Sequence, residues 1–172
     1  MGAPRTLLAL ALSAAALVLS ACGFTPLYAE GGVSPGLSAV EVVAPDGRTA
    51  FLLRERLEDA LAHDRGKAPA YRLNYALTET RTPRGLGPDN AASRYELNVR
   101  VDWKLTDLVR GAEVKTGRTD VLITYGAADQ PYAGVAAQEN GQDRAAAEAA
   151  RRMRLDLAQY FAASHPAKTA AR

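Results

Sequence analysis

The clearest pattern in this chain is an alternation of apolar and polar side chains between residues 93 and 107. A two-residue period indicates a β-strand with one face buried and the other face in water. At about 3.4 Å per residue the strand spans roughly 50 Å, so we expect it to project beyond the rest of its domain. The apolar positions are Tyr95, Leu97, Val99, Val101, Trp103 and Leu105.

Three further segments predict strands. Residues 37–43 are short and rich in Val, residues 71–80 repeat the alternation, and residues 114–125 follow a turn at Arg110 and Gly111. β-branched and aromatic residues are enriched in all three, as is typical of strands. In the last of them the inward set is expected to be Thr119, Val121, Ile123 and Tyr125.

Two segments have the helical period instead. Residues 47–65 carry apolar side chains at helical spacing, and Asp46 stands where it could cap the helix. Residues 135–163 are rich in Ala and have a second apolar stripe. The two stripes are Ala50, Leu53, Leu57 and Leu61 in the first helix, and Ala146, Ala149, Met153, Leu157, Tyr160 and Phe161 in the second.

The predicted order is therefore β-α-β-β-β-α. A mostly antiparallel sheet of four strands has one apolar face, and two amphipathic helices can cover it. We predict an α+β fold of two layers, with both helices on one face of the sheet, over residues 37–163. The opposite face of the sheet should be polar.

The N-terminus predicts a targeting signal. Residues 7–19 are apolar and uncharged, which is too short for a membrane span and the right length for a signal peptide. The next residues, Leu19-Ser20-Ala21-Cys22, resemble the bacterial lipobox, in which the Cys thiol is lipidated and the chain is cleaved before it. We therefore expect a signal peptide over 1–21, a lipidated tether over 22–36 and a flexible tail over 164–172. The alternative is that Cys22 is an ordinary buried thiol.

Composition narrows the classes of function. The 172 residues carry 21 Lys and Arg against 19 Asp and Glu, which is not the clustered basic charge of a nucleic-acid-binding protein. One Cys and two His cannot form a Cys/His zinc site, and we expect no metal and no cofactor. No nucleophile or metalloprotease motif is present, and His63 is expected to be an exposed residue at a helix end.

The candidate binding residues are three arginines in the predicted loop between the second and third strands. Arg81, Arg84 and Arg94 face only Asp89 as an opposing charge there. Guanidinium groups suit phosphates and carboxylates. The alternative is an ordinary solvated hairpin end. Arg100 and Lys104 on the polar strand face are a second, weaker candidate.

Residues 22–28, CGFTPLY, resemble the opening of the LPS-assembly lipoprotein LptE family. The order of elements also resembles that family, whose fold is two helices on a four-stranded sheet. The resemblance implies a lipid-anchored protein on the periplasmic side of the cell outer membrane, without catalytic activity. It further implies that the chain plugs and supports assembly of the LptD β-barrel and binds lipopolysaccharide during LPS transport.

Three residues beside the lipid are the expected membrane or barrel contacts: Phe24, Leu27 and Tyr28. The alternative is that they pack on their own domain. Two other functions stay open at this point, an auxiliary lipoprotein of an envelope lipid ABC transporter and a lipid-anchored periplasmic hydrolase.

Overall fold

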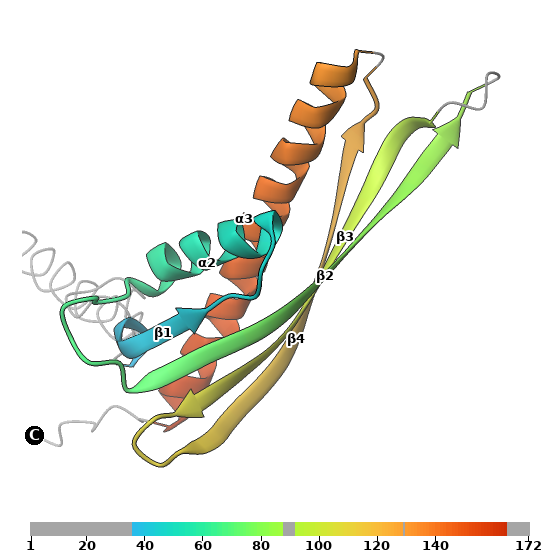
Figure 1. Ribbon diagram of the computed structural model, residues 1–172. Helices are drawn as coiled ribbons and strands as arrows, with labels where there is room; N and C mark the ends of the chain where they lie inside the picture. The colour runs from blue at the N-terminus through green and yellow to red at the C-terminus, as the bar shows by residue number, and fades with distance from the viewer. Residues whose placement is uncertain (1–35, 88–91, 129, 165–172) are drawn as a thin grey trace, which may run out of the picture. The chain divides into compact units, whose positions relative to one another are not determined.

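The computed structural model describes residues 36–87, 92–128 and 130–164, all within one compact unit, Val33–Arg172. Four strands and two long helices follow a short 3-10 turn (Figure 1). The elements are η1 (Leu37–Ala39), β1 (Val40–Val43), α2 (Arg48–Leu61), β2 (Tyr71–Leu86), β3 (Ala92–Asp107), β4 (Ala112–Gly126) and α3 (Pro131–Ser164).

The four strands form one mixed sheet in the order β1-β2-β3-β4. β1 runs parallel to β2, and the other neighbours are antiparallel. The predicted mostly antiparallel sheet is therefore confirmed. β2 and β3 are 16 residues each, and their hairpin runs well past the short β1 and past α2, as Figure 1 shows.

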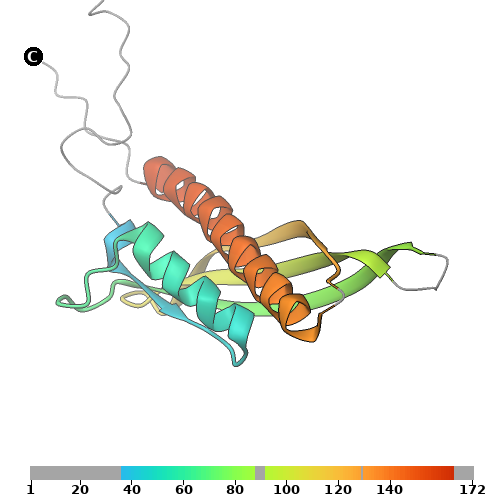
Figure 2. The same ribbon diagram turned by 90° about the horizontal axis from the view of Figure 1, so that it is seen from above.

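Both helices lie on one face of the sheet, α2 beside β1 and α3 along the length of β4 (Figures 1 and 2). The apolar stripe predicted for α2 is buried throughout, and that of α3 is buried except for the half-buried Tyr160. Tyr75 donates its hydroxyl to the carbonyl oxygen of Ala50 at 2.6 Å, which ties α2 to β2 within the core. The predicted α+β fold of two layers is confirmed.

The ends of several elements differ from the prediction. β1 begins only at Val40, because residues 37–39 form the 3-10 turn. Asp46 does not cap α2: the helix begins after Gly47, whose φ of 120° suits glycine, and no side chain caps it. α3 begins at Pro131, ahead of the predicted position, since proline is tolerated in the first turn of a helix.

The largest difference concerns the predicted loop from Arg81 to Arg94, which was wrong. β2 and β3 stay paired through Arg84↔Arg94 and as far as Leu86↔Ala92. The sequence did not indicate this end of β2, because its residues are mostly polar and include Pro83. A strand with two polar faces has no alternation of apolar and polar side chains.

Candidate functional site

Cys22, Phe24, Leu27 and Tyr28 lie outside the residues that the structure describes. They stay predictions from the sequence.

The structure separates the three candidate arginines. Arg84 and Arg94 are directly opposite each other on β2 and β3, and both point to the sheet face that the helices leave uncovered. Arg84 Nε pairs with Glu96 Oε2 of the same face at 2.8 Å. Arg81 is an odd number of positions away from Arg84, so its side chain lies on the helix side. Two of the three arginines therefore share a site, and Arg81 does not join them.

Arg81 instead connects the β2–β3 hairpin to α3 through a side-chain hydrogen bond. Its Nη1 donates to Oε1 of Gln138 at 2.7 Å, and its guanidinium carbon lies 4.6 Å from the centre of the Tyr95 ring. Tyr95 in turn lies beside Tyr125, with 5.7 Å between ring centres. Tyr125 approaches Gly141 of α3 so closely that a Cβ there would be 3.0 Å from the ring. This cluster positions the far part of the sheet against the N-terminal half of α3.

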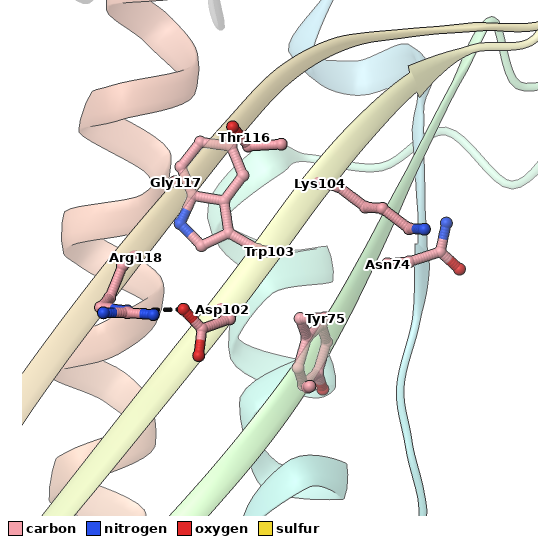
Figure 3. A pocket seen from close by; sticks show the side chains of 9 residues that line it. Asn74, Tyr75, Asp102, Trp103, Lys104, Thr116, Gly117 and Arg118 are labelled. Carbon is pink, nitrogen blue, oxygen red and sulfur yellow. Dashed lines mark hydrogen bonds and ion pairs between the residues drawn. The ribbon is translucent and has the colours of Figure 1, made fainter.

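The uncovered face of the sheet has a trough of about 620 Å³ (Figure 3). Three consecutive residues from each of β2, β3 and β4 line it, and no helix residue does. The middle residues Tyr75 and Trp103 are core residues, 7% and 3% exposed, so the floor between the polar side chains is strand backbone. The polar and small side chains around the floor belong to Asn74, Ala76, Asp102, Lys104, Thr116 and Arg118.

Arg118 and Asp102 close one side of the trough, with Nε and Oδ1 2.6 Å apart, as the dashed line in Figure 3 marks. Lys104 and Asn74 extend side by side at the other side (Figure 3). Among the residues that line the trough, Lys104 is the one that the sequence analysis named as a candidate for binding. The sequence did not predict that Thr116 and Arg118 line the trough. Their position opposite β3 depends on a β-bulge at Leu105/Thr106, and no pattern in the sequence indicates that bulge.

The same face carries complementary ion pairs between neighbouring strands. Each pair is solvent-exposed and contributes little to the stability of the fold, so the main consequence of the pairs is that most of the charge on this face is compensated. The pairs are Arg72–Glu41 at 2.9 Å, Arg84–Glu96 and Arg100–Asp120 at 2.8 Å each, and Arg118–Asp102. Such a face suits contact with another polar surface or with water.

The described residues do not assemble a recognisable catalytic centre. No group of three or more His, Cys, Asp and Glu side chains in this part of the chain could hold a metal ion. Burial raises the pKa of Tyr75, a core residue, and Arg151 and Arg152 lower the pKa of Glu148 on α3 to about 2. The hydroxyl of Tyr75 points away from the trough, to the carbonyl oxygen of Ala50 in the core, and Glu148 does not line the trough. His63 is half-buried rather than exposed as expected.

No helix among the described residues combines the length and the apolar character needed to cross a membrane.

Comparison with known structures identifies relatives of the same fold. A crystal structure of a protein from Caulobacter crescentus CB15, described as a lipoprotein, is 56% identical, with a TM-score of 0.67, and the match covers 77% of this chain and 96% of that one. Rare lipoprotein B from Shewanella oneidensis is 18% identical, with a TM-score of 0.57 over 73% and 98% of the two chains. Lipoprotein B from Nitrosomonas europaea is 15% identical, with a TM-score of 0.55 over 77% and 90%. The last two show the fold alone.

A search of curated protein sequences gives no match. The model of the family described as "LptE: Lipopolysaccharide-assembly" matches residues 37–163, which is the whole of the two-layer domain from η1 almost to the end of α3. The chain therefore belongs to the LptE family of lipopolysaccharide-assembly proteins.

Proposed function

We propose that this chain is an outer-membrane lipoprotein, anchored through Cys22, that forms a complex with an LptD-type β-barrel. In that complex it plugs the barrel, supports its assembly and binds lipopolysaccharide on its way to the cell surface. It carries out no catalysis. The observation that carries the proposal is the family match, because it spans the complete folded domain rather than one motif.

The uncovered sheet face is consistent with a place inside a barrel. Barrel interiors wide enough to hold another protein are polar, so an occupant needs a polar surface without a large uncompensated charge. The interstrand ion pairs of β1 to β4 provide such a surface over the length of the sheet.

For lipopolysaccharide we propose Arg84 and Arg94 as the phosphate contacts. They stand opposite each other near the end of the hairpin, on the uncovered face. Arg81 lies on the other face and is engaged by Gln138 and Tyr95, so we assign it to positioning α3.

The complex is tested by affinity purification of the full-length chain from detergent-solubilised membranes, with captured proteins identified by mass. We expect an LptD-type barrel in stoichiometric amount. Recovery of an inner-membrane transporter complex without a barrel would contradict the proposal and favour the transporter lipoprotein.

The lipid anchor is tested in the same cells with the Cys22→Ala variant. Because Cys22 holds the acyl chains in this proposal, the variant should lose labelling by a fatty-acid analogue and leave the outer-membrane fraction. Continued labelling of the variant would show that the lipid is elsewhere or absent.

A further inference from the structure

β2 has an open edge. β1 pairs only with Tyr71–Asn74 at the start of β2, although β2 continues to Leu86. From Tyr75 onward no described strand pairs with β2 on that side. The backbone groups that point to this side have therefore no strand partner within the described part of the chain.

The register shows which backbone groups these are. The N–H of Ala127 donates to the carbonyl of Ser93 at 3.0 Å, so odd-numbered residues of β3 bond towards β4. By alternation, even-numbered residues of β3 bond towards β2, where the register pairs them with even-numbered residues. The N–H and C=O groups of odd-numbered residues in β2 consequently point to the open side. Beyond the pairing with β1, the residues that present both an N–H and a C=O group to the open side are Leu77, Glu79 and Arg81.

The opposite edge of the sheet is formed by β4, and side chains of α3 cap it. β4 is an edge strand along its whole length, but arginines of α3 donate to its outward carbonyls. Arg152 reaches the carbonyl of Asp120 at 2.8 Å, and Arg144 reaches that of Thr124 at 3.0 Å. A side chain bound to edge carbonyls blocks the approach of another strand. No side chain of the described residues is seen to cap the edge of β2 in this way.

The side chains along the open edge also suit strand pairing. Thr78, Thr80 and Thr82 point to the uncovered face and are uncharged, β-branched residues with high strand propensity. A hollow of about 310 Å³ lies beside them. Pro83 has no N–H and its nitrogen would face the open side, so it ends the stretch at which a strand could pair.

We propose that the edge of β2 from Tyr75 to Thr82 binds an extended peptide segment of a protein partner through main-chain hydrogen bonds. Only another extended backbone matches a row of alternating N–H and C=O groups, which is why the occupant is a strand rather than a small ligand. The side chains of Glu79 and Arg81 are held by the helices, so the backbone is left as the main recognition element. The inference rests on the proposed function in one respect: it takes the barrel chain as the partner that supplies the segment.

The test compares Arg81→Pro with Arg81→Ala in the full-length chain. Both variants lose the guanidinium, but only proline removes the N–H that points to the open edge, and it leaves the bonds to β3 in place. Recovery of the barrel with Arg81→Pro should fall at least tenfold below that with Arg81→Ala. Equal thermal unfolding of the two variants serves as the control for folding.

Amide hydrogen exchange on the wild-type protein provides a second measurement that needs no variant. The amides of Glu79 and Arg81 should exchange in the isolated chain and become protected in the barrel complex. Equal recovery by the two variants, or unchanged exchange of these amides in the complex, would overturn this inference and leave the proposed function intact. Protection that depends on the concentration of the isolated chain would show a second copy at the edge and would also overturn it. If the wild-type chain recovers no barrel, the proposed function itself fails.

Discussion

At the scale of single residues, the contact between Trp103 and Gly117 fixes the middle of the sheet. The two residues are opposite each other on β3 and β4, and the indole lies over the glycine. A Cβ on Gly117 would come within 2.2 Å of the ring, so a larger residue there would displace the tryptophan. Glycine at this position weakens the strand by itself but permits the buried aromatic.

The first prediction concerns Trp103, which is 3% exposed and is the single tryptophan of the chain. Trp103→Ala should lower the free energy of unfolding by about 3–5 kcal/mol, because a large cavity replaces a buried aromatic ring. In the wild-type protein, iodide should quench the tryptophan fluorescence only after unfolding. Ready quenching in the folded protein would show that the face assignment of β3 is inverted.

A second residue, Glu148 on α3, predicts a pH dependence. It accepts hydrogen bonds from Arg151 and Arg152, which lower its pKa to about 2. A depressed carboxyl pKa contributes stability that is fully present above the unfolded pKa and is lost as the pH falls towards 2. Because the arginines are largely exposed, we expect only a small contribution to the free energy of unfolding.

The measurement is urea unfolding of wild type and Glu148→Gln between pH 7 and pH 2. The variant should be slightly less stable at pH 7, and the difference should disappear near pH 2. A difference that stays constant over this range would mean that the ion pairs do not contribute.

At the scale of elements, one carboxylate connects the two helices to β2. Glu79 accepts from the Thr49 hydroxyl of α2 at 2.6 Å and from the Gln142 amide of α3 at 2.9 Å. Arg48 of α2 adds an exposed ion pair to Glu139 of α3 at 3.5 Å. This polar contact lies at the N-terminal end of α2, beyond the apolar stripe, and sets how the helices lie on the sheet.

Glu79→Ala should therefore destabilise the fold by about 1–3 kcal/mol, since two partly buried donors lose their acceptor. Thr80→Ala, one position further on the uncovered face, is the matched control and should cost clearly less. Chemical denaturation of both variants measures the loss in free energy of unfolding for each. Equal losses would show that Glu79 is merely a surface residue.

The element scale also shows how far the sequence could predict the fold. Wherever apolar side chains marked one face, as from Tyr95 to Leu105 or along the stripe of α2, both element and face were predicted correctly. Arg81, Thr82 and Arg84 put polar side chains on both faces of β2, so the alternation shows no difference between an apolar and a polar face. This end of the strand was therefore predicted as a loop. The candidate arginines Arg81, Arg84 and Arg94 were found by residue type, but their separation onto two faces of the sheet depends on the part of β2 that the sequence did not predict.

At the scale of the whole molecule, the hairpin end should carry ligand binding. Arg84→Ala together with Arg94→Ala should weaken lipopolysaccharide binding at least tenfold at moderate salt, since each charge-assisted bond contributes roughly 1.5–3 kcal/mol and about 1.4 kcal/mol is tenfold. Barrel recovery should be unchanged. Binding of purified lipopolysaccharide equal to wild type would mean that these arginines form only an ordinary solvated hairpin end.

Participation in lipopolysaccharide assembly at the outer membrane, the proposed function, predicts a change that can be measured in living cells. The most direct measurement is the amount of lipopolysaccharide at the cell surface, quantified by surface labelling while the chain is depleted from the bacterium that encodes it. We predict that surface lipopolysaccharide falls as the protein disappears and returns when the wild-type gene is restored. Unchanged surface lipopolysaccharide in fully depleted cells would contradict the proposed function.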